Sequence, residues 1–346
     1  MVHRAAHSLI LLGAFIPGIA SAASVLVDPS GTIGVATIDE ALATCADGDT
    51  LVLAPGDYPP TIIEDRVLTV SGAAPGVRIG SLEVLGGSVA INNVEFVGPG
   101  IALAVRGTAL TGTDLNFRGG ASKRSDPAIL ISREADATFS GVTIEDWEAA
   151  SGVVVLEGAS STRFEASSFS RNHSADGGAL RVDGGSVHIS ECAFTENQAE
   201  AWGGDIAMTG GILSVERSTF TGSSAAYGGA IGAGGGAILL IEDTEFHGTN
   251  ASSAGGFLYA EGASATVARL AGVDAEAEVG GAIALFRASL LGEDWSLGRS
   301  RADLGGHVHG AESTATLRRT HMTAGVAEQG AAVAWSSGRL DVSNAL

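Results

Sequence analysis

The chain has 346 residues, of which 50 are glycine, and its formal net charge at pH 7 is -20. High glycine without a G-X-Y period excludes collagen, and a hydrophobic content of 45% excludes a disordered chain. So acidic a surface repels nucleic acid, and it repels an anionic polysaccharide unless a cation intervenes.

Residues 1–22 have the pattern of a signal peptide. A basic pair, His3 and Arg4, precedes an apolar run from Leu9 to Ile16, and Ala20-Ser21-Ala22 forms a small-x-small cleavage site. The mature chain is therefore expected to begin near residue 23 and to be secreted, either extracellular or on a bacterial cell surface. No later stretch reaches 18 apolar residues, so no membrane-spanning segment is expected in the mature chain.

Residues 23–60 are interpreted as an N-terminal cap and a first strand. In residues 37–46, apolar residues recur at i, i+3, i+4 and i+7, which predicts a short amphipathic helix. Thr37 at its N-cap and Glu40 three residues later form a capping box. A helix there would cover the open end of whatever follows, and residues 50–53 read as the first strand.

Residues 61–346 contain a repeat of about 25 residues. A Gly-Gly-x-aliphatic motif recurs at intervals of 25 to 27 residues, starting at Gly177, Gly203, Gly228, Gly255, Gly280 and Gly305, and as a variant at Gly330. A large apolar residue follows 17 or 18 residues after each motif, or after its fainter earlier copies. These residues are Phe117, Ile144, Phe169, Phe194, Phe220, Phe246, Val273, Leu297 and Met322.

This period predicts an all-β fold, a right-handed single-stranded parallel β-helix (solenoid) of about ten to twelve coils with an N-terminal capping helix. Equivalent residues of successive coils, such as Phe169, Phe194 and Phe220, would stack about 4.8 Å apart. Cys45 and Cys192 fall too far apart in such a stack for a disulfide. The sequence stops 16 residues after Gly330 without a capping segment, which we interpret as a fragment of a longer chain, the alternative being a partner that covers the last coil.

Two stretches resemble known families. Residues 37–58, IDEAL followed by DGDTLVLAPGDY, resemble the N-terminal cap of pectate-lyase-like right-handed β-helix proteins. Residues 177–283 resemble the repeats of polymorphic outer membrane proteins, which pair GGAI with FxxN; Phe169–Asn172 and Phe194–Asn197 supply the second half here. The first resemblance implies a fold that hosts lyases, hydrolases, epimerases and adhesins, and the second implies a surface protein.

Catalytic candidates are few. Lys123 and Arg124 form the one basic cluster, and Asp126 follows it. A uronate-cleaving enzyme needs a cation to hold the carboxylate and a group to exchange a proton, so this cluster could supply both. The alternative is a solvated loop.

Binding candidates lie in the repeats. Trp202 and Tyr227 directly precede Gly-Gly pairs in successive coils, so they form either a platform for sugar rings or a stack that caps the turn. Asp176 and Asp205 lie near the motif glycines of neighbouring coils, where carboxylates could bind Ca²⁺, although the spacing is not that of an EF-hand or of a nonapeptide RTX repeat. No metal site is assigned and no cofactor is required; Ca²⁺ is the candidate ion.

Glu191, Arg217 and Asp243 fall in one column, three residues before the phenylalanines, and are expected to form a surface charge ladder. Together these features favour a secreted or cell-surface β-helix scaffold, non-catalytic and adhesion-like or passenger-like, whose partner would be a carbohydrate or a surface protein. The alternative is a carbohydrate-active enzyme, a polysaccharide lyase or epimerase acting on an acidic polysaccharide. The sequence leaves catalysis open and leans against it.

Overall fold

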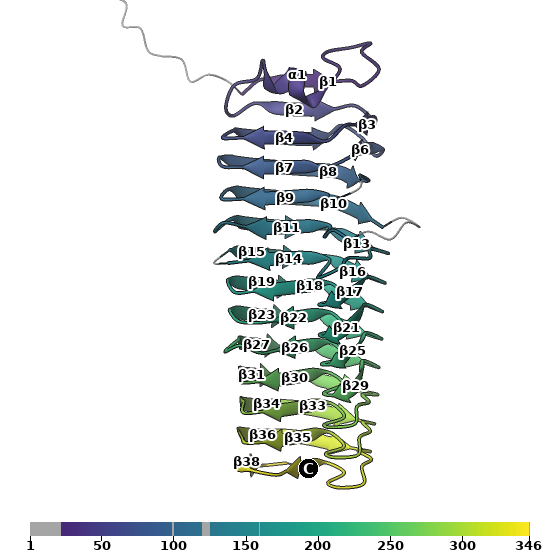
Figure 1. The fold of residues 1–346 in the computed structure, drawn as a ribbon, viewed down its shortest axis with the longest axis vertical. Helices are drawn as coiled ribbons and strands as arrows, with labels where there is room; N and C mark the ends of the chain where they lie inside the picture. Colours follow the sequence, from purple (N-terminus) through teal and green to yellow (C-terminus); the bar gives the residue numbers. More distant parts are fainter. Residues whose placement is uncertain (1–21, 99, 120–124, 159, 346) are drawn as a thin grey trace, which may run out of the picture.

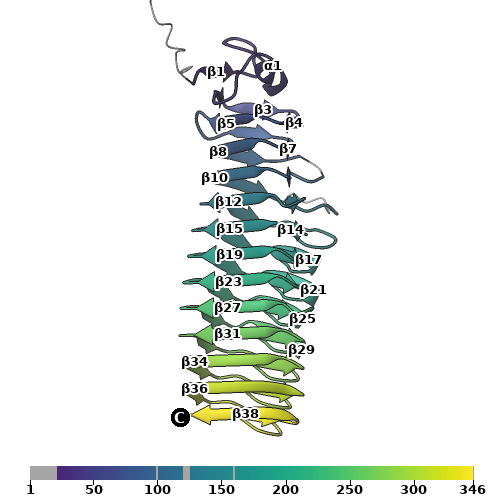
Figure 2. The same cartoon turned by 90° about the vertical axis from the view of Figure 1, so that its left-hand side faces the viewer.

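The computed structural model describes residues 22–98, 100–119, 125–158 and 160–345. The predicted signal peptide lies almost entirely outside this part of the chain. The described residues wind into one elongated parallel β-helix of about 13 turns (Figures 1 and 2), which confirms the predicted fold class with slightly more coils than expected.

Each coil contributes strands to as many as three parallel sheets, here named A, B and C. Sheet A has 22 strands in the described residues and consists of two ladders. The first ladder contains β1 (Ser24–Val27), β2 (Thr50–Leu53), β5 (Val67–Gly72), β8 (Ser88–Phe96), β10 (Ala109–Arg118), β12 (Asp136–Ser140), β15 (Ser161–Glu165), β19 (Ser186–Ser190), β23 (Ile212–Glu216), β27 (Ile238–Glu242), β31 (Ser264–Ala268), β34 (Ser289–Gly298), β36 (Ser313–Thr323) and β38 (Gly338–Ser343). The second contains β3 (Gly56–Tyr58), β6 (Val77–Ile79), β13 (Thr143–Glu145), β16 (Ser168–Ser170), β20 (Ala193–Thr195), β24 (Thr219–Thr221), β28 (Glu245–His247) and β32 (Ala271–Val273), and the long strands β8, β10, β34 and β36 join the two.

Sheet B runs the length of the molecule, and sheet C forms a short wall beside its middle (Figure 1). The strands of sheet B are β4 (Thr61–Glu64), β7 (Leu82–Leu85), β9 (Leu103–Arg106), β11 (Ile129–Ser132), β14 (Val154–Glu157), β18 (Leu180–Asp183), β22 (Ile206–Met208), β26 (Ile231–Ala233), β30 (Leu258–Glu261), β33 (Ile283–Phe286), β35 (Val308–Ala311) and β37 (Val333–Trp335). Sheet C contains β17 (His173–Asp176), β21 (Gln198–Trp202), β25 (Ser224–Tyr227) and β29 (Asn250–Ala254).

The cap at the N-terminal end contains the predicted helix in a shorter form. Helix α1 spans Ile38–Leu42 and buries Ile38 and Ala41 against the first coil. Thr37 is its N-cap, and the Thr37 hydroxyl accepts a hydrogen bond from the Glu40 amide at 3.1 Å. The Glu40 carboxylate accepts from the Ala36 amide at 2.9 Å, so the capping interaction is present but reaches one residue further back than expected.

The interior is built from stacked identical side chains. Phe169 and Phe194 lie with ring centroids 4.8 Å apart and nearly parallel, and Phe220 follows Phe194 at 4.7 Å. All three rings are fully buried. The predicted column of phenylalanines is therefore confirmed, and its spacing equals the distance between hydrogen-bonded strands.

One member of the predicted column is wrong. Phe246 pairs in register with Gly272, and the neighbouring Val273 is only half-buried. The space above Gly272 is filled by Phe257, whose ring lies 5.3 Å from that of Phe246; a Cβ on Gly272 would lie 2.3 Å from the Phe257 ring. The sequence spacing missed this exchange because a glycine leaves no apolar signal in its own coil.

The two glycines of the repeated motif have different roles. The first, as in Gly203 with φ +58°, adopts the left-handed conformation that turns the chain into sheet B. The second permits close stacking of coils, since a Cβ on Gly204 would lie 2.1 Å from the carbonyl oxygen of Gly229 in the next coil. The recurrence of the pair therefore reflects backbone geometry at every turn.

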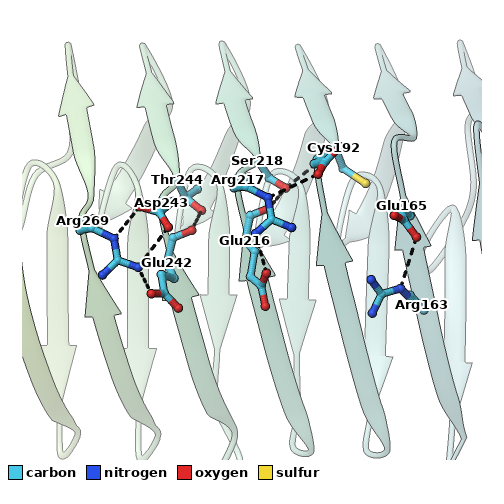
Figure 3. A network of polar contacts seen from close by, with 11 residues as sticks. Arg163, Glu165, Cys192, Glu216, Arg217, Ser218, Glu242, Asp243, Thr244 and Arg269 are labelled. Carbon is cyan, nitrogen blue, oxygen red and sulfur yellow. Dashed lines mark hydrogen bonds and ion pairs between the residues drawn. The ribbon is translucent and has the colours of Figure 1, made fainter.

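Charged residues with positive φ occupy a corner of sheet A in successive coils. From Glu191 the charges alternate in sign through Arg217, Asp243, Arg269, Asp294 and Arg319. Arg217 Nε lies 3.4 Å from Glu191 Oε1. Arg269 Nε lies 2.6 Å from Asp243 Oδ1, and Arg269 also contacts Glu242 (Figure 3). The predicted charge ladder is thus confirmed as a surface feature, and exposed pairs of this kind add little stability.

Both cysteines are buried free thiols, as expected from their separation. Burial raises the pKa of the Cys192 thiol to about 11, so this thiol stays protonated and unreactive at neutral pH. Among the described residues, no helix has the length and apolar character needed to cross a bilayer.

Candidate functional site

The outer face of sheet B meets the wall formed by sheet C along the middle coils. Strand β18 alternates buried Leu180 and Val182 with the half-exposed Arg181 and Asp183, so the two charged side chains stand on the outer face. In the next coils the position of Arg181 is taken by Ala207 and then Gly232. These small residues leave a hollow between the charged pair and the end of sheet C.

Trp202 occupies much of this hollow. It is the last residue of β21, and its indole lies over the floor of small residues, because a Cβ on Gly234 would lie 3.3 Å from Trp202 Cζ3. The Trp202 backbone amide donates to Asp176 Oδ1 at 3.2 Å in the preceding coil. The side chain of Trp202 is half-buried, which leaves part of the ring open to a ligand.

An aromatic cluster supports Trp202 from the C-terminal side. The ring of Tyr259 meets Trp202 edge-on at 5.1 Å and Tyr227 at 5.0 Å, while Trp202 and Tyr227 lie 5.9 Å apart. Tyr259 is 6% exposed, and its hydroxyl donates to Glu261 Oε2 at 3.1 Å. Burial, with the neighbouring Glu261 carboxylate, raises the pKa of Tyr259 far above its ordinary value, so this residue acts as a neutral anchor.

Between Trp202 and Arg181 lies a pocket of about 250 Å³. Its walls also include Asp176, Thr209 and the Gly234–Gly235 turn. Arg181 Nη2 lies 2.8 Å from Asp183 Oδ2, and the Thr209 hydroxyl donates to Asp183 Oδ1 at 2.8 Å. A pocket lined by an indole and a guanidinium, together with the Asp176 carboxylate and the Thr209 hydroxyl, is suited to one sugar ring that carries an anionic group.

Trp202 and Tyr227, the predicted binding pair, lie next to each other, but they stand differently with respect to the pocket. Trp202 lines this pocket, whereas Tyr227 contacts Trp202 from behind and is absent from the pocket wall. Its role in binding a ligand remains a prediction.

The predicted catalytic cluster has a different place. Lys123 and Arg124 lie outside the described residues. Asp126 is exposed and lies two coils N-terminal to the coil that contains Arg181; its backbone carbonyl accepts a hydrogen bond from Trp147 Nε1 at 3.0 Å. Asp126 is thus two coils away from Arg181, and its catalytic role is still only a prediction.

Asp205 is not a surface carboxylate, which corrects the idea that it could join Asp176 in a calcium site. Its side chain is fully buried inside the coil and accepts hydrogen bonds from Asn197 and Ser223. Alternation along a strand would place it opposite to Ile206, but the Asp205 and Ile206 amides both donate to the Ala230 carbonyl, at 2.9 and 3.0 Å, so the alternation is broken here and both side chains point inward. Within the described ranges, no group of three or more His, Cys, Asp or Glu side chains gathers as a metal site would require.

A larger, shallower hollow of about 640 Å³ follows sheet C. Alanine and serine residues form much of its surface, and Glu200, Glu276, Glu278 and Asp303 line it together with Arg301. The excess of carboxylates makes it a poor place for an anionic ligand.

Sequence reasoning missed Arg181, Thr209 and Tyr259. Each stands in a different coil, Thr209 one coil after Arg181 and Tyr259 two coils after Thr209, and only the register of sheet B brings them to one face. One signal was available: Arg181 and Asp183 flank Val182 at the alternation expected of a strand with one buried face.

Known proteins resemble this chain in fold. No protein-family model matches the chain, and no curated protein sequence matches it. Among solved structures, a mannuronic acid-specific family 6 polysaccharide lyase from human gut microbiota is similar with a TM-score of 0.61 and 10% identity, covering 93% of this chain and 82% of its own. A family 6 alginate lyase in complex with a trisaccharide gives 0.54 and 10%, covering 92% and 85%. The mannuronan C-5 epimerase A-module of Azotobacter vinelandii gives 0.52 and 11%, covering 89% and 92%.

These neighbours change two expectations. The favoured interpretation, a non-catalytic adhesion or passenger scaffold, is contradicted, because all three similar structures are enzymes that act on polysaccharides; the findings favour the carbohydrate-active alternative. The polymorphic outer membrane protein repeat type is not supported either, and the Phe-x-x-Asn pairs have a local explanation in internal hydrogen bonds such as Asn197 Nδ2 to the Phe169 carbonyl at 3.0 Å. The chain has the right-handed parallel β-helix fold that these polysaccharide lyases and this epimerase share.

Proposed function

We propose that this protein is a carbohydrate-active enzyme of the polysaccharide lyase or epimerase class, acting on an acidic polysaccharide at the pocket between Arg181 and Trp202. The observation that supports it is the pairing of a half-exposed guanidinium with an indole face across a sugar-sized hollow. The similar structures are of enzymes with mannuronic acid, alginate and mannuronan in their descriptions, which agrees with an anionic substrate.

The chemistry follows from the residues at the pocket. Elimination and epimerisation of a uronate share a first step, in which the proton on the carbon next to the carboxylate leaves and negative charge spreads onto the carboxylate. A guanidinium held against that carboxylate stabilises the developing charge. Arg181 is oriented by Asp183, and Asp176 is the carboxylate among the described pocket residues that could exchange a proton.

The positive charge of Arg181 bears on how a protein of net charge -20 could bind an anionic polymer. A polyanion is repelled by the molecule as a whole, so a productive contact needs a local cation. Arg181 provides one in the groove, and an added divalent cation would assist by bridging carboxylates of the protein and the substrate. A polysaccharide substrate would be met outside the cell, so the predicted secretion of the chain agrees with this function, and it stays a proposal.

The test is an activity assay on alginate, pectate and chondroitin, with and without calcium, following unsaturated products spectroscopically and epimerised residues by NMR. We expect activity on at least one of the three and none on a neutral glucan. Arg181→Gln should lower kcat/KM roughly 10- to 100-fold, since a charge-assisted hydrogen bond contributes about 1.5–3 kcal/mol.

Arg163→Gln is the matched control. Arg163 also pairs with a carboxylate two residues later, Glu165, at 3.5 Å, but it stands on the outer face of sheet A. It should leave kcat/KM unchanged. Absence of activity on all three acidic polymers, or equal losses in the two variants, would refute the proposal.

A further inference from the structure

The interior of the coil directly behind the pocket contains a buried carboxyl that the proposed chemistry does not use. Asp205 follows the Gly203–Gly204 turn and is 0% exposed. Its Oδ1 accepts from Asn197 Nδ2 at 2.8 Å and from Ser223 Oγ at 2.7 Å, whereas its Oδ2 is buried without a hydrogen-bond partner. Burying an oxygen without a hydrogen-bond partner costs free energy of folding, which an apolar side chain at this position would avoid.

The two donors lie at the starts of the strands that hold the aromatic residues. Asn197 directly precedes β21, which ends at Trp202, and Ser223 directly precedes β25, which ends at Tyr227. One carboxyl oxygen therefore ties both strands to the turn that follows Trp202. The Asn197–Asp205 bond closes a loop eight residues apart that contains the whole of β21.

Other coils tie the equivalent strand of sheet C to its turn without a carboxyl. Two coils further on, the Thr249 hydroxyl donates to the Gly256 carbonyl at 2.7 Å, and in the preceding coil the hydroxyl of Ser174, within β17, donates to the Gly177 carbonyl at 2.9 Å. Each of these bonds stays within its own coil. Only Asp205, among these three, links two coils at once.

No charged side chain of the described residues faces the Asp205 carboxyl. Its hydrogen-bond donors are an amide from the start of β21 and a hydroxyl from the start of β25, and the equivalent positions of the coils on either side are Ala179 and Ala230. Burial raises the pKa of Asp205 to about 8, although the two hydrogen bonds oppose this rise. The carboxyl is therefore mostly neutral at pH 7.

We propose that Asp205 is a positioning residue for the pocket: its carboxyl fixes, from inside the coil, the two strands that present Trp202 and Tyr227, and loss of its side chain releases the Trp202 indole. This inference uses the proposed function only for the choice of ligand. The positioning of Trp202 itself is independent of any ligand.

The experiment compares the natural protein with Asp205→Asn, Asp205→Ala and a control, Asp243→Asn, whose aspartate stands on the exposed charge ladder. Trp202 emission is isolated by subtracting the spectrum of the same protein carrying Trp202→Phe, because the chain has four tryptophans. Affinity for an oligomannuronate and an oligogalacturonate is measured by calorimetry from pH 6 to pH 9.

An ionised Asp205 would be a buried charge with no cation of the described residues beside it, which favours opening of the coil around it. In the natural protein and in Asp243→Asn, Trp202 emission should therefore change above about pH 8 and affinity should fall, approaching tenfold per pH unit, the limit for one ionisation. Asp205→Asn cannot ionise and still offers an oxygen to both donors, so both readouts should be flat across this range. Asp205→Ala should show displaced Trp202 emission already at pH 6, with unfolding still cooperative.

The inference is overturned if Asp205→Asn retains the pH profile of Trp202 emission, a comparison that does not depend on the alanine variant folding. It is also overturned if folded Asp205→Ala has natural Trp202 emission. If neither oligosaccharide binds the natural protein, the substrate proposal fails, while the emission profiles alone still decide the role of Asp205.

Discussion

The residue directly before a strand of sheet B is buried in most coils, and its type differs between coils. This position is occupied by alanine in several coils, namely at Ala179, Ala230, Ala282 and Ala332. Where it differs, the larger side chain has a specific partner: Phe257 fills the space over Gly272, and His307 Nδ1 lies 2.9 Å from the Ser300 hydroxyl. Asp205 is the one acidic residue in this set, and it is bonded on one oxygen only.

Asp205→Asn should make the protein more stable at neutral pH. The folded-state pKa of Asp205, about 8, lies above its ordinary value of 3.8, so between these values the native state binds more protons than the unfolded chain. Stability due to this group is therefore complete below about pH 4 and is lost as pH rises toward 8. Urea unfolding should show the variant a few kcal/mol more stable at pH 7, at about 1.4 kcal/mol per pKa unit, and little changed at pH 4.

The control for this prediction is the pH series itself. The difference between the two proteins should grow from pH 4 to pH 8 and then level off. A constant difference across the series would mean that Asp205 has an ordinary pKa in the folded protein.

The sequence predicted where each turn into sheet B occurs, but it did not predict which way the Asp205 side chain points. The Gly-Gly-x-aliphatic motif located every turn into sheet B in this region, but the position of Asp205 near the motif glycines wrongly suggested a carboxylate open to Ca²⁺. The Asp205 and Ile206 amides both donate to the Ala230 carbonyl, which breaks the alternation just before β22, so both side chains point inward. A local break of this kind has no trace in hydrophobic periodicity.

At the scale of elements, stacked phenylalanines unite the coils. Phe194 lies between Phe169 and Phe220, with parallel rings and no exposed surface. Because each coil contacts only the coils next to it, a weak coil interrupts the whole stack. The period predicted this column correctly up to Phe246. In the next coil the column position is Gly272, and the Phe257 side chain, from a different position of the repeat, fills the space beside Phe246.

Removing one ring of this column should destabilise the protein strongly. Phe194→Ala should lower the free energy of unfolding by about 3–5 kcal/mol, since the rings above and below cannot close the cavity. Phe194→Leu should cost clearly less, because it retains most of the apolar volume. Thr195→Ala, a neighbouring half-exposed position, serves as the control in urea titrations; a loss for Phe194→Ala no larger than for this control would contradict the stacking argument.

At the scale of the whole molecule, the site is made by register. Arg181, Thr209 and Trp202 come from two successive coils, and Tyr259 from a coil further along, yet the parallel pairing of sheet B and the wall of sheet C bring them to one groove. The repeat that predicted the fold hides these residues, because each differs from its counterparts in neighbouring coils. Composition also pointed away from catalysis, since a net charge of -20 conceals the local cation at Arg181.

The most direct test of this account is a crystal structure of the protein with an acidic oligosaccharide that it binds. The account predicts one sugar ring against the Trp202 indole, with its carboxylate within hydrogen-bond distance of the Arg181 guanidinium and its hydroxyls toward Asp183 and Thr209. A ligand bound instead along the acidic hollow of sheet C, or on the outer face of sheet A, would contradict it.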